Sequence, residues 1–344
     1  MIGELSGDKV VFDKDVSLEL PHYGRKKGDI LLFSLEEAAY LMEHKKISVN
    51  FKNKELNVDE FIKTASGISD NFELKYIVYK DLRARGYFVQ PSVTDFRVYP
   101  RGGRPNETPS KYFSYVISER RPIGLSELIK GVVSAENVRK RMILSIVDEE
   151  GDTTYYEIKS AKLSGSRERF SVEKKTATLL HDRVIVWDSD FSYELDANGF
   201  FGKFIDEKRL QLSLVESAYL LKNGFIKIVD LNDKKISLNE FIRLASKIEV
   251  DFSIKYDVYE DIRDKGLIAK TGFKFGSHFR VYEDISETKS HSKYLVHAIS
   301  HEHIFLLPEM SRAIRLSQTV KKRMLFAYKK GRGIRYIEVG RIKM

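Results

Sequence analysis

YIVYKDLRARG, at residues 76–86, returns as YDVYEDIRDKG at residues 256–266. The apolar side chains of this stretch recur every three or four residues, which is the spacing of one face of an α-helix. In and just before the second copy they are Phe252, Tyr256, Tyr259 and Ile262. Each copy ends in a glycine, the residue that most often follows a helix. The stretch therefore predicts the same long helix twice, with its aromatic face packed in a core.

Other stretches recur in the same order on both sides of this helix. LNVDEFI at 56–62 matches ISLNEFI at 236–242, FRVY at 96–99 returns at 279–282, and NVRKRM at 137–142 matches TVKKRM at 319–324. Such ordered matches indicate a duplicated domain, since two units are too few for a solenoid. We expect a first repeat at 1–165, a polar linker at 166–175 and a second repeat at 176–344.

Within each repeat the pattern changes from short strands to helices. Strands are expected at 10–12 and 184–187, and helices follow Ser34 and Ser213, each with a glutamate three residues later, which is the spacing of a capping box. Alternating runs at 294–299 and 324–328 predict further strands. The expected fold class is α/β with mixed α+β character. It comprises two tandem repeats, each a small α+β N-terminal unit followed by a mixed α/β unit.

Composition narrows the class of protein. The chain has 344 residues, of which 42% are hydrophobic, so it can fill two globular cores. It has no cysteine, which excludes disulfides, thiolate metal sites and cysteine nucleophiles. No apolar run is long enough for a membrane helix and the first residues do not resemble a signal peptide, so we expect a cytoplasmic protein with no membrane partner. The net charge of +9 is typical of phosphate-binding proteins, but also of solvated lysines.

The two repeats differ at positions where chemistry could reside. Residues 291–294 read HSKY, whereas the matching residues 109–112 read PSKY, so His291 takes the place of Pro109. Proline has no ring nitrogen that can carry a proton. The second repeat also has a loop with two glycines before FRVY, residues 271–278, which we call the glycine-bearing loop. The segment from Gly266 to Tyr282 is three residues longer than the matching segment of the first repeat. The second repeat is therefore predicted to be active and the first to be a scaffold.

These motifs together resemble those of the archaeal tRNA-splicing (tRNA-intron) endonucleases of the two-repeat, homodimeric type. The resemblance rests on YDVYEDIRDKG at 256–266, TGFKFGSHFRVY at 271–282, HSKYLV at 291–296 and RLSQTVKK at 315–322. It covers most of the second repeat and, more weakly, the first. It implies that the mixed α/β unit is nuclease-like, that no cofactor and no metal are needed, and that Tyr282, His291 and Lys322 form a catalytic triad.

Lys322 is preferred to Lys321 because the first repeat has Arg139 at the earlier position and Lys140 at the later one. The comparison of the repeats leaves Lys321 open as the catalytic lysine. Lys321 is otherwise expected to contact RNA.

The three residue types suit RNA cleavage. RNA carries its own nucleophile, the 2′-hydroxyl, so a protein needs to supply a base, an acid for the leaving 5′-oxygen and positive charge for the phosphorane. An imidazole ordinarily titrates near neutral pH. By resemblance, Tyr282 is the general base, His291 the general acid and Lys322 the cation. The resemblance further implies excision of introns from precursor tRNA at bulge-helix-bulge motifs, with 2′,3′-cyclic phosphate and 5′-hydroxyl ends.

Charge is distributed unevenly between the repeats. Residues 312–344 contain eleven Lys or Arg and one acidic residue, while the matching span 130–162 contains six of each kind. This pattern predicts an RNA-binding surface on the second repeat. Arg315 matches the family position at which an arginine stacks on a bulged base, and Arg335 or Arg341 is expected to supply a second such contact.

A short acidic run lies in the first repeat, where the second repeat has lysine and arginine. Its members are Asp148, Glu149, Glu150 and Asp152. An acidic hairpin turn is the simplest interpretation. The resemblance implies instead a loop that inserts into a basic cleft of a partner, so that two chains form a homodimer with two active sites.

Two other classes of protein deserve comparison. A non-catalytic RNA-binding or assembly subunit would keep the basic surface, but the intact Tyr282, His291 and Lys322 argue against it. A metal-dependent nuclease needs clustered carboxylates, and the second repeat has no paired acids near the glycine-bearing loop.

Overall fold

The computed structural model describes residues 1–12, 19–92, 94–166, 170–283 and 291–344, and the chain divides into two compact units. Unit 1 comprises residues 1–159, 304–311 and 340–344, and unit 2 comprises 160–303 and 312–339. Each unit is therefore built from more than one segment of the chain. Residues 167–169 of the predicted linker lie outside the described residues, and the linker and repeat boundaries stay a prediction.

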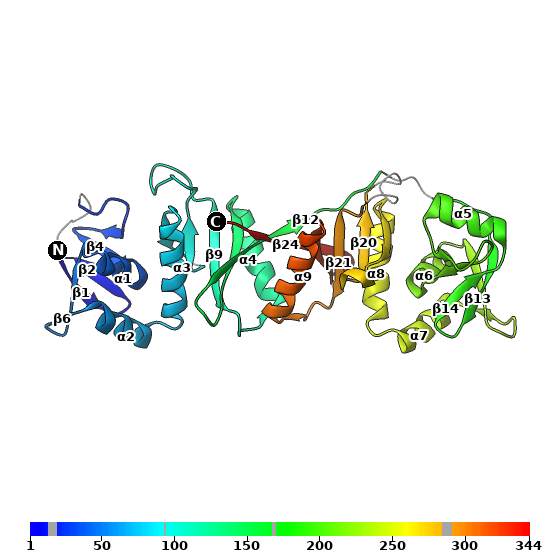
Figure 1. Ribbon diagram of the computed structural model, residues 1–344, viewed down its shortest axis with the longest axis horizontal. Coiled ribbons are helices and arrows are strands. Elements are labelled where there is room, and N and C mark those ends of the chain that lie inside the picture. Colours follow the sequence, from blue (N-terminus) through cyan, green and yellow to red (C-terminus); the bar gives the residue numbers. More distant parts are fainter. Residues whose placement is uncertain (13–18, 93, 167–169, 284–290) are drawn as a thin grey trace. The chain divides into compact units, whose positions relative to one another are not determined.

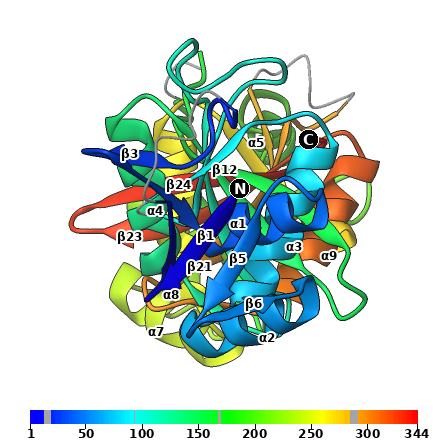
Figure 2. The same cartoon turned by 90° about the vertical axis from the view of Figure 1, so that its left-hand side faces the viewer.

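The N-terminal part of unit 1 is a sheet with the strand order β3-β4-β2-β1-β5-β6. Its elements are β1 (Ile2–Ser6), β2 (Lys9–Phe12), β3 (Arg25–Lys27), β4 (Ile30–Ser34), α1 (Leu35–Glu43), β5 (Ser48–Phe51), β6 (Lys54–Leu56) and α2 (Val58–Ile68). Strand β1 lies beside β5 in parallel, and Figure 2 looks onto this part of the unit. The buried faces of the strands pack against α1, as at Val10, Phe33 and Ala38.

The remainder of unit 1 is a second mixed layer. It contains α3 (Phe72–Ala84), β7 (Val89–Pro91), β8 (Phe96–Val98), β9 (Tyr112–Ser118), β10 (Ile123–Gly124), α4 (Leu125–Asn137), β11 (Arg141–Val147) and β12 (Thr153–Ala161), and the last two residues of β12 are grouped with unit 2. Strands β9 and β11 are parallel, and α4 supplies the crossover that such a pair needs. Strand β10 pairs with β22 (Ile304–Phe305), which belongs to the same unit.

Unit 2 opens with an equivalent sheet in the order β15-β16-β14-β13-β17-β18. Its elements are β13 (Lys175–Leu180), β14 (Arg183–Val186), α5 (Ser189–Gly199), β15 (Lys203–Phe204), β16 (Leu210–Leu212), α6 (Leu214–Lys222), β17 (Ile226–Val229), β18 (Lys235–Ile236) and α7 (Leu238–Ile248). The helix α5 was not expected from the sequence. Asp188 caps it by accepting a hydrogen bond from Phe191 N, a local signal that could have revealed it.

The second layer of unit 2 carries the expected long helix and strands. They are α8 (Phe252–Asp264), β19 (Ile268–Thr271), the short 3₁₀ helix η1 (Phe273–Phe275), β20 (Phe279–Tyr282), β21 (Tyr294–Ile299), α9 (Leu307–Thr319), β23 (Arg323–Lys330) and β24 (Gly333–Ile342). Helix α8 packs across β19, β21 and β23 (Figure 1). The first residues of α9 and the last residues of β24 are grouped with unit 1.

Several sequence predictions are confirmed. The α/β fold class with two repeats is correct. Ser34 and Ser213 cap α1 and α6 through complete capping boxes with Glu37 and Glu216. The aromatic face of α8 is buried, and the helix is followed by Gly266 at φ +73°, a conformation that glycine adopts readily. None of the described helices is long and apolar enough to cross a membrane.

Candidate active site

Strand topology brings the predicted triad to one end of the sheet in unit 2. Tyr282 is the last residue of β20, which runs antiparallel to β21, and β21 is parallel to β23. The end of β20 and the starts of β21 and β23 therefore lie at the same edge. His291 precedes β21 by three residues and Lys322 immediately precedes β23.

Three hydrogen bonds join the strands at this edge. Lys293 N donates to Val281 O at 3.0 Å, and Arg323 N donates to Lys293 O at 3.0 Å. Lys322 Nζ donates to the carbonyl of Ser292 at 2.9 Å. The ammonium group of Lys322 is thus held by Ser292, which follows His291 in the sequence. Val281, which precedes Tyr282, is bonded to Lys293.

The three side chains differ in exposure. His291 is exposed, Lys322 is half-buried, and the Tyr282 side chain is 6% exposed. No hydrogen bond joins the Tyr282 hydroxyl to a residue that the structure describes. Residues 284–290, which lie between Tyr282 and His291 in the sequence, fall outside the described residues.

The geometry favours Lys322 over Lys321. Lys321 is exposed and has φ +54°, as has Arg139 in unit 1 with φ +56°. The side chain of Lys140 in unit 1 donates to Ser110 O at 2.8 Å, which reproduces the Lys322 contact with Ser292. Lys140 and Lys322 therefore occupy the same position in the two repeats.

An aromatic ring of the glycine-bearing loop lies against Lys322. Lys322 Nζ lies 5.8 Å from the centre of the Phe275 ring, and the guanidinium carbon of Arg280 lies 5.8 Å from the same ring. Arg280 Nε also donates to Thr271 O at 2.9 Å. Burial and then the positive charge of Arg280 lower the pKa of Lys322, and burial with Arg97 does the same to the pKa of Lys140.

Unit 1 holds its tyrosine differently. The Tyr99 hydroxyl donates to Gln90 Oε1 at 2.7 Å, and burial raises the pKa of Tyr99. The residue matching Gln90 in unit 2 is Lys270, since Gln90 pairs with Arg97 and Lys270 pairs with Arg280 across equivalent strands. Unit 1 therefore differs from unit 2 in its tyrosine contact as well as in Pro109.

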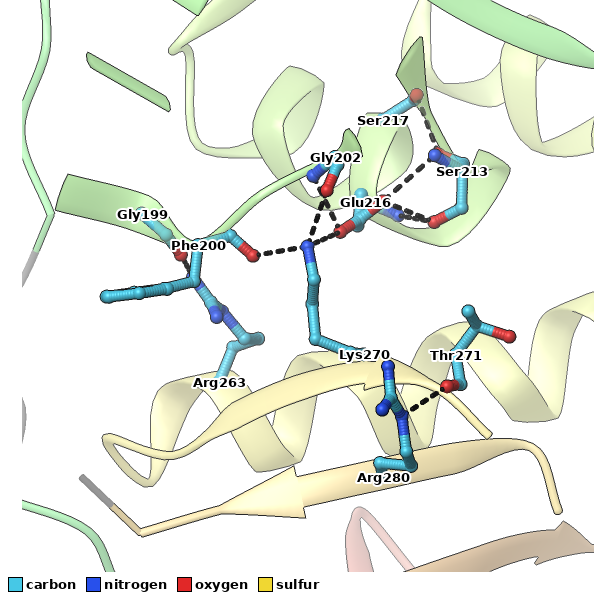
Figure 3. A network of polar contacts seen from close by, with 10 residues as sticks. All are labelled: Gly199, Phe200, Gly202, Ser213, Glu216, Ser217, Arg263, Lys270, Thr271 and Arg280. Atoms are coloured by element: carbon cyan, nitrogen blue, oxygen red, sulfur yellow. Dashed lines mark hydrogen bonds and ion pairs between the residues drawn. The ribbon is translucent and has the colours of Figure 1, made fainter. Parts of the chain in front are cut away.

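The Lys270 side chain points toward the N-terminal part of unit 2 (Figure 3). Its Nζ donates to Phe200 O at 2.8 Å and to Gly202 O at 2.6 Å, and lies 3.6 Å from Glu216 Oε1. Burial alone would raise the pKa of Glu216, but the charge of Lys270 and the bonded N–H groups lower it overall. Glu37 is the equivalent residue of unit 1, where Gln90 stands at the position of Lys270. Burial raises the pKa of Glu37 to about 7, although the N–H groups of Ser34 and Gly24 and the charge of Lys9 act in the opposite direction.

The predicted RNA-binding arginines lie on different elements. Arg315 is exposed on the part of α9 that belongs to unit 2, and Arg335 is exposed on β24 of the same unit. Arg341 is also exposed, but it falls in the end of β24 that is grouped with unit 1. The contacts of all three with RNA stay a prediction.

The acidic run forms the turn between β11 and β12. Asp148 Oδ1 accepts hydrogen bonds from Glu150 N at 3.1 Å and from Asp152 N at 2.8 Å, so it holds the turn itself. Glu149 forms an ion pair of 2.8 Å with Arg120. Glu150 and Asp152 are exposed, and their carboxylates have no ion pair with the residues that the structure describes.

The described residues include no group of three or more His, Asp or Glu side chains that could hold a metal ion.

Comparison with known proteins defines the class of enzyme. The family model for the tRNA intron endonuclease catalytic C-terminal domain matches residues 72–155 and 252–336, and that for the N-terminal domain matches 1–62 and 176–242. The chain is similar to proteins named tRNA-splicing endonuclease from Methanococcoides burtonii (49% identical, 100% of both chains), Methanosarcina mazei (49%, 99% of this chain and 98% of the other) and Haloferax volcanii (33%, 78% and 79%). The protein is therefore an endonuclease. It belongs to the tRNA intron endonuclease family.

Proposed function

We propose that the protein excises introns from precursor tRNA at bulge-helix-bulge motifs, and that unit 2 supplies the active site. The observation that carries the proposal is the convergence of Tyr282, His291 and Lys322 at one edge of the sheet of unit 2. The names of the relatives supply the class of substrate. The cleavage itself is metal-independent in this proposal.

The reaction is a transfer of phosphorus between oxygens of the RNA. Tyr282 takes the proton of the 2′-hydroxyl, whose oxygen attacks the adjacent phosphorus. The bond from phosphorus to the 5′-oxygen breaks, and His291 donates a proton to that oxygen. Lys322 stabilises the charge that develops on the phosphorane. The products are a 2′,3′-cyclic phosphate and a 5′-hydroxyl.

The contacts of the three side chains suit these tasks. The Tyr282 hydroxyl has no bond to a described residue that would hold its proton, and His291 is open to solvent and to substrate. Lys322 is held by one carbonyl, so its remaining N–H groups can face a phosphate. Unit 1 has Pro109 at the histidine position, and we assign it to scaffolding and partner binding.

Assembly is proposed as a homodimer. Each chain would then provide one active unit and one scaffold unit, and the turn at residues 148–152 would meet a basic surface of the partner, with Glu150 and Asp152 as its free acids. A cytoplasmic location fits a tRNA-processing role.

The test is incubation of the purified chain alone with an intron-containing precursor tRNA. Cutting at both splice sites in EDTA, with cyclic phosphate ends, is the expected result. A substrate with a single 2′-deoxy nucleotide at one cut should be left intact there and be cut at the other site. Cutting at the deoxy site, or a 3′-hydroxyl end, would place the protein in the metal-dependent class instead.

A further inference from the structure

Unit 2 contains a cavity of about 210 Å³ that none of the predicted catalytic residues lines. It lies between the start of α6, the helix α8 and the glycine-bearing loop, and Figure 3 shows Ser213, Lys270 and Thr271 of its wall. Val215, Tyr259, Ala269 and Phe279 give it apolar surface. Charged side chains also line it, namely Glu216, Glu249, Lys255 and Lys270. The cavity thus combines apolar walls with polar and charged groups that could fix the orientation of a small ligand.

Phe273 also lines this cavity, and its side chain is 86% exposed. Burying a phenylalanine side chain is favourable by roughly 2 kcal/mol, so this exposed ring at the rim of a cavity offers binding energy to a ligand that covers it. The loop that carries it is well bonded. Gly272 N donates to His278 O at 2.9 Å, Gly276 N donates to Phe273 O at 3.0 Å, and a Cβ at Gly272 would come within 2.3 Å of Ser277 Oγ.

The same loop reaches the active site. Phe275, two residues after Phe273, is the aromatic ring that lies beneath both Lys322 and Arg280. Phe273 and Phe275 therefore connect the cavity with the proposed phosphate-binding lysine. Unit 1 has a shorter segment between its long helix and Tyr99, and it has Gln90 in place of Lys270. The longer loop with Phe273 and Phe275 therefore belongs to the unit that carries His291.

His278 lines the cavity with a ring whose protonation state and tautomer follow from its contacts. Its Nδ1 accepts a hydrogen bond of 2.9 Å from Ala298 N, so in the neutral ring the proton lies on Nε2. Burial lowers the pKa of His278 to about 4, which keeps the ring neutral at physiological pH. The lysines of the wall are paired with carboxylates, Lys255 with Glu249 at 3.0 Å and Lys270 with Glu216 at 3.6 Å. A neutral N–H donor beside such paired charges suits the edge of a nucleobase.

We propose that this cavity binds an unpaired nucleobase of the RNA close to the cleaved phosphate, and that Phe273 stacks on the face of that base. The proposal rests on the proposed RNA substrate and deepens it. Single-stranded bases are commonly recognised by stacking on aromatic side chains with hydrogen bonds at the base edge. Phe273 is thus a positioning residue rather than a catalytic one.

The first experiment separates binding from chemistry. Phe273→Ala should weaken RNA binding and raise KM roughly tenfold or more, with kcat unchanged. Phe273→Tyr and Phe273→Trp should restore most of the affinity, since both rings stack. Tyr193→Ala is the matched control, because Tyr193 is a 54% exposed aromatic of the same unit outside the cavity. An unchanged KM, or failure of both aromatic variants, would overturn the proposal.

A second experiment reads the cavity directly. The chain has one tryptophan, Trp187, so the double variant Trp187→Phe and Phe273→Trp carries a single reporter at the cavity mouth. Precursor tRNA should quench its fluorescence at the concentrations that saturate cleavage, whereas free mononucleotides at the same concentrations should not. Quenching by mononucleotides alone would identify a free-nucleotide site. Absence of quenching by saturating RNA would contradict the proposal.

The two proposals fail separately. Quenching by RNA without any cleavage would refute the splicing function and leave the base-binding cavity standing. Normal cleavage by the wild type together with unchanged KM in Phe273→Ala would refute only the cavity.

Discussion

The hydroxyl of Tyr99 donates a hydrogen bond of 2.7 Å to Gln90 Oε1. In unit 2 the equivalent position is Lys270, whose ammonium group is bonded to the carbonyls of Phe200 and Gly202. A tyrosine that donates to an amide oxygen is held in its protonated form. The residue at the position of Gln90 and Lys270 therefore distinguishes the two repeats, as does the presence of His291 in one and Pro109 in the other.

This relationship predicts the outcome of Lys270→Gln. The glutamine should accept the Tyr282 hydroxyl as Gln90 accepts that of Tyr99, and cleavage should fall by at least about tenfold. Lys270→Met is the control, since it removes the contact with Glu216 equally but cannot accept that hydrogen bond. Single-turnover rates on precursor tRNA compare the two. Equal rates in the two variants would show that capture of the tyrosine is unimportant.

Lys322 provides a prediction of pH dependence. Burial and Arg280 lower its pKa by disfavouring the ammonium form, so removal of the Arg280 charge should raise that pKa. Only the neutral amine reacts with acylating reagents, and Arg280→Gln should therefore shift the pH profile of Lys322 modification to higher pH. Mass spectrometry of the labelled peptides gives the profile.

Lys140 serves as an internal control in the same samples. It should respond to Arg97→Gln and not to Arg280→Gln, because Arg97 is the charge that lowers its pKa. A profile of Lys322 that does not move with Arg280→Gln would refute the electrostatic link.

The capping glutamates predict opposite effects of pH on stability. Burial raises the pKa of Glu37 to about 7, so its folded state binds more protons than the unfolded state between pH 4.5 and 7. Stability is then lost as the pH rises through this window, by on the order of 3 kcal/mol. Glu37→Gln should abolish that loss.

For Glu216 the dependence of stability on pH has the opposite sign. Its pKa is lowered, so it contributes stability above the unfolded pKa and that contribution is lost as the pH falls. Glu216→Gln should destabilise unit 2 at neutral pH more than in acid. Denaturant unfolding at pH 4.5, 6 and 7.5 measures both variants, and identical pH slopes in the two would contradict the assignments.

The acidic turn predicts a specific effect on assembly. Glu150→Gln with Asp152→Asn should weaken dimerisation without unfolding unit 1, because these carboxylates have no partner among the described residues. Asp148 is left unchanged, since its Oδ1 holds the turn. Light scattering across a dilution series measures the molar mass of the protein in solution. A double variant that dimerises like the wild type, or a wild type that is an active monomer, would defeat the dimer model.

Sequence alone predicted the features that recur locally. Capping boxes at Ser34 and Ser213, the aromatic face of α8 and the contrast of His291 with Pro109 can be read from spacing and from alignment of the two halves. The helix α5 is hard to predict from the sequence because its apolar face is short, and the cap at Asp188 is its main local signal.

The remaining features depend on tertiary packing. Nothing in the spacing of Gln90 and Tyr99 reveals that their side chains meet, since the contact follows from the register of β7 and β8. The direction of Lys270 depends on carbonyls about seventy positions earlier in the chain. The cavity likewise combines residues near 215, 255 and 275 that only folding brings together.

The most direct measurement of the central claim is the single-turnover cleavage rate of His291→Ala on an intron-containing precursor tRNA in EDTA. Loss of the general acid should lower the rate by roughly 10² to 10⁴, while binding of the RNA, measured by filter retention, stays close to that of the wild type. Pro109→Ala in unit 1 should leave the rate unchanged. A His291→Ala variant that cleaves at nearly the wild-type rate would contradict the assignment of the active site to unit 2.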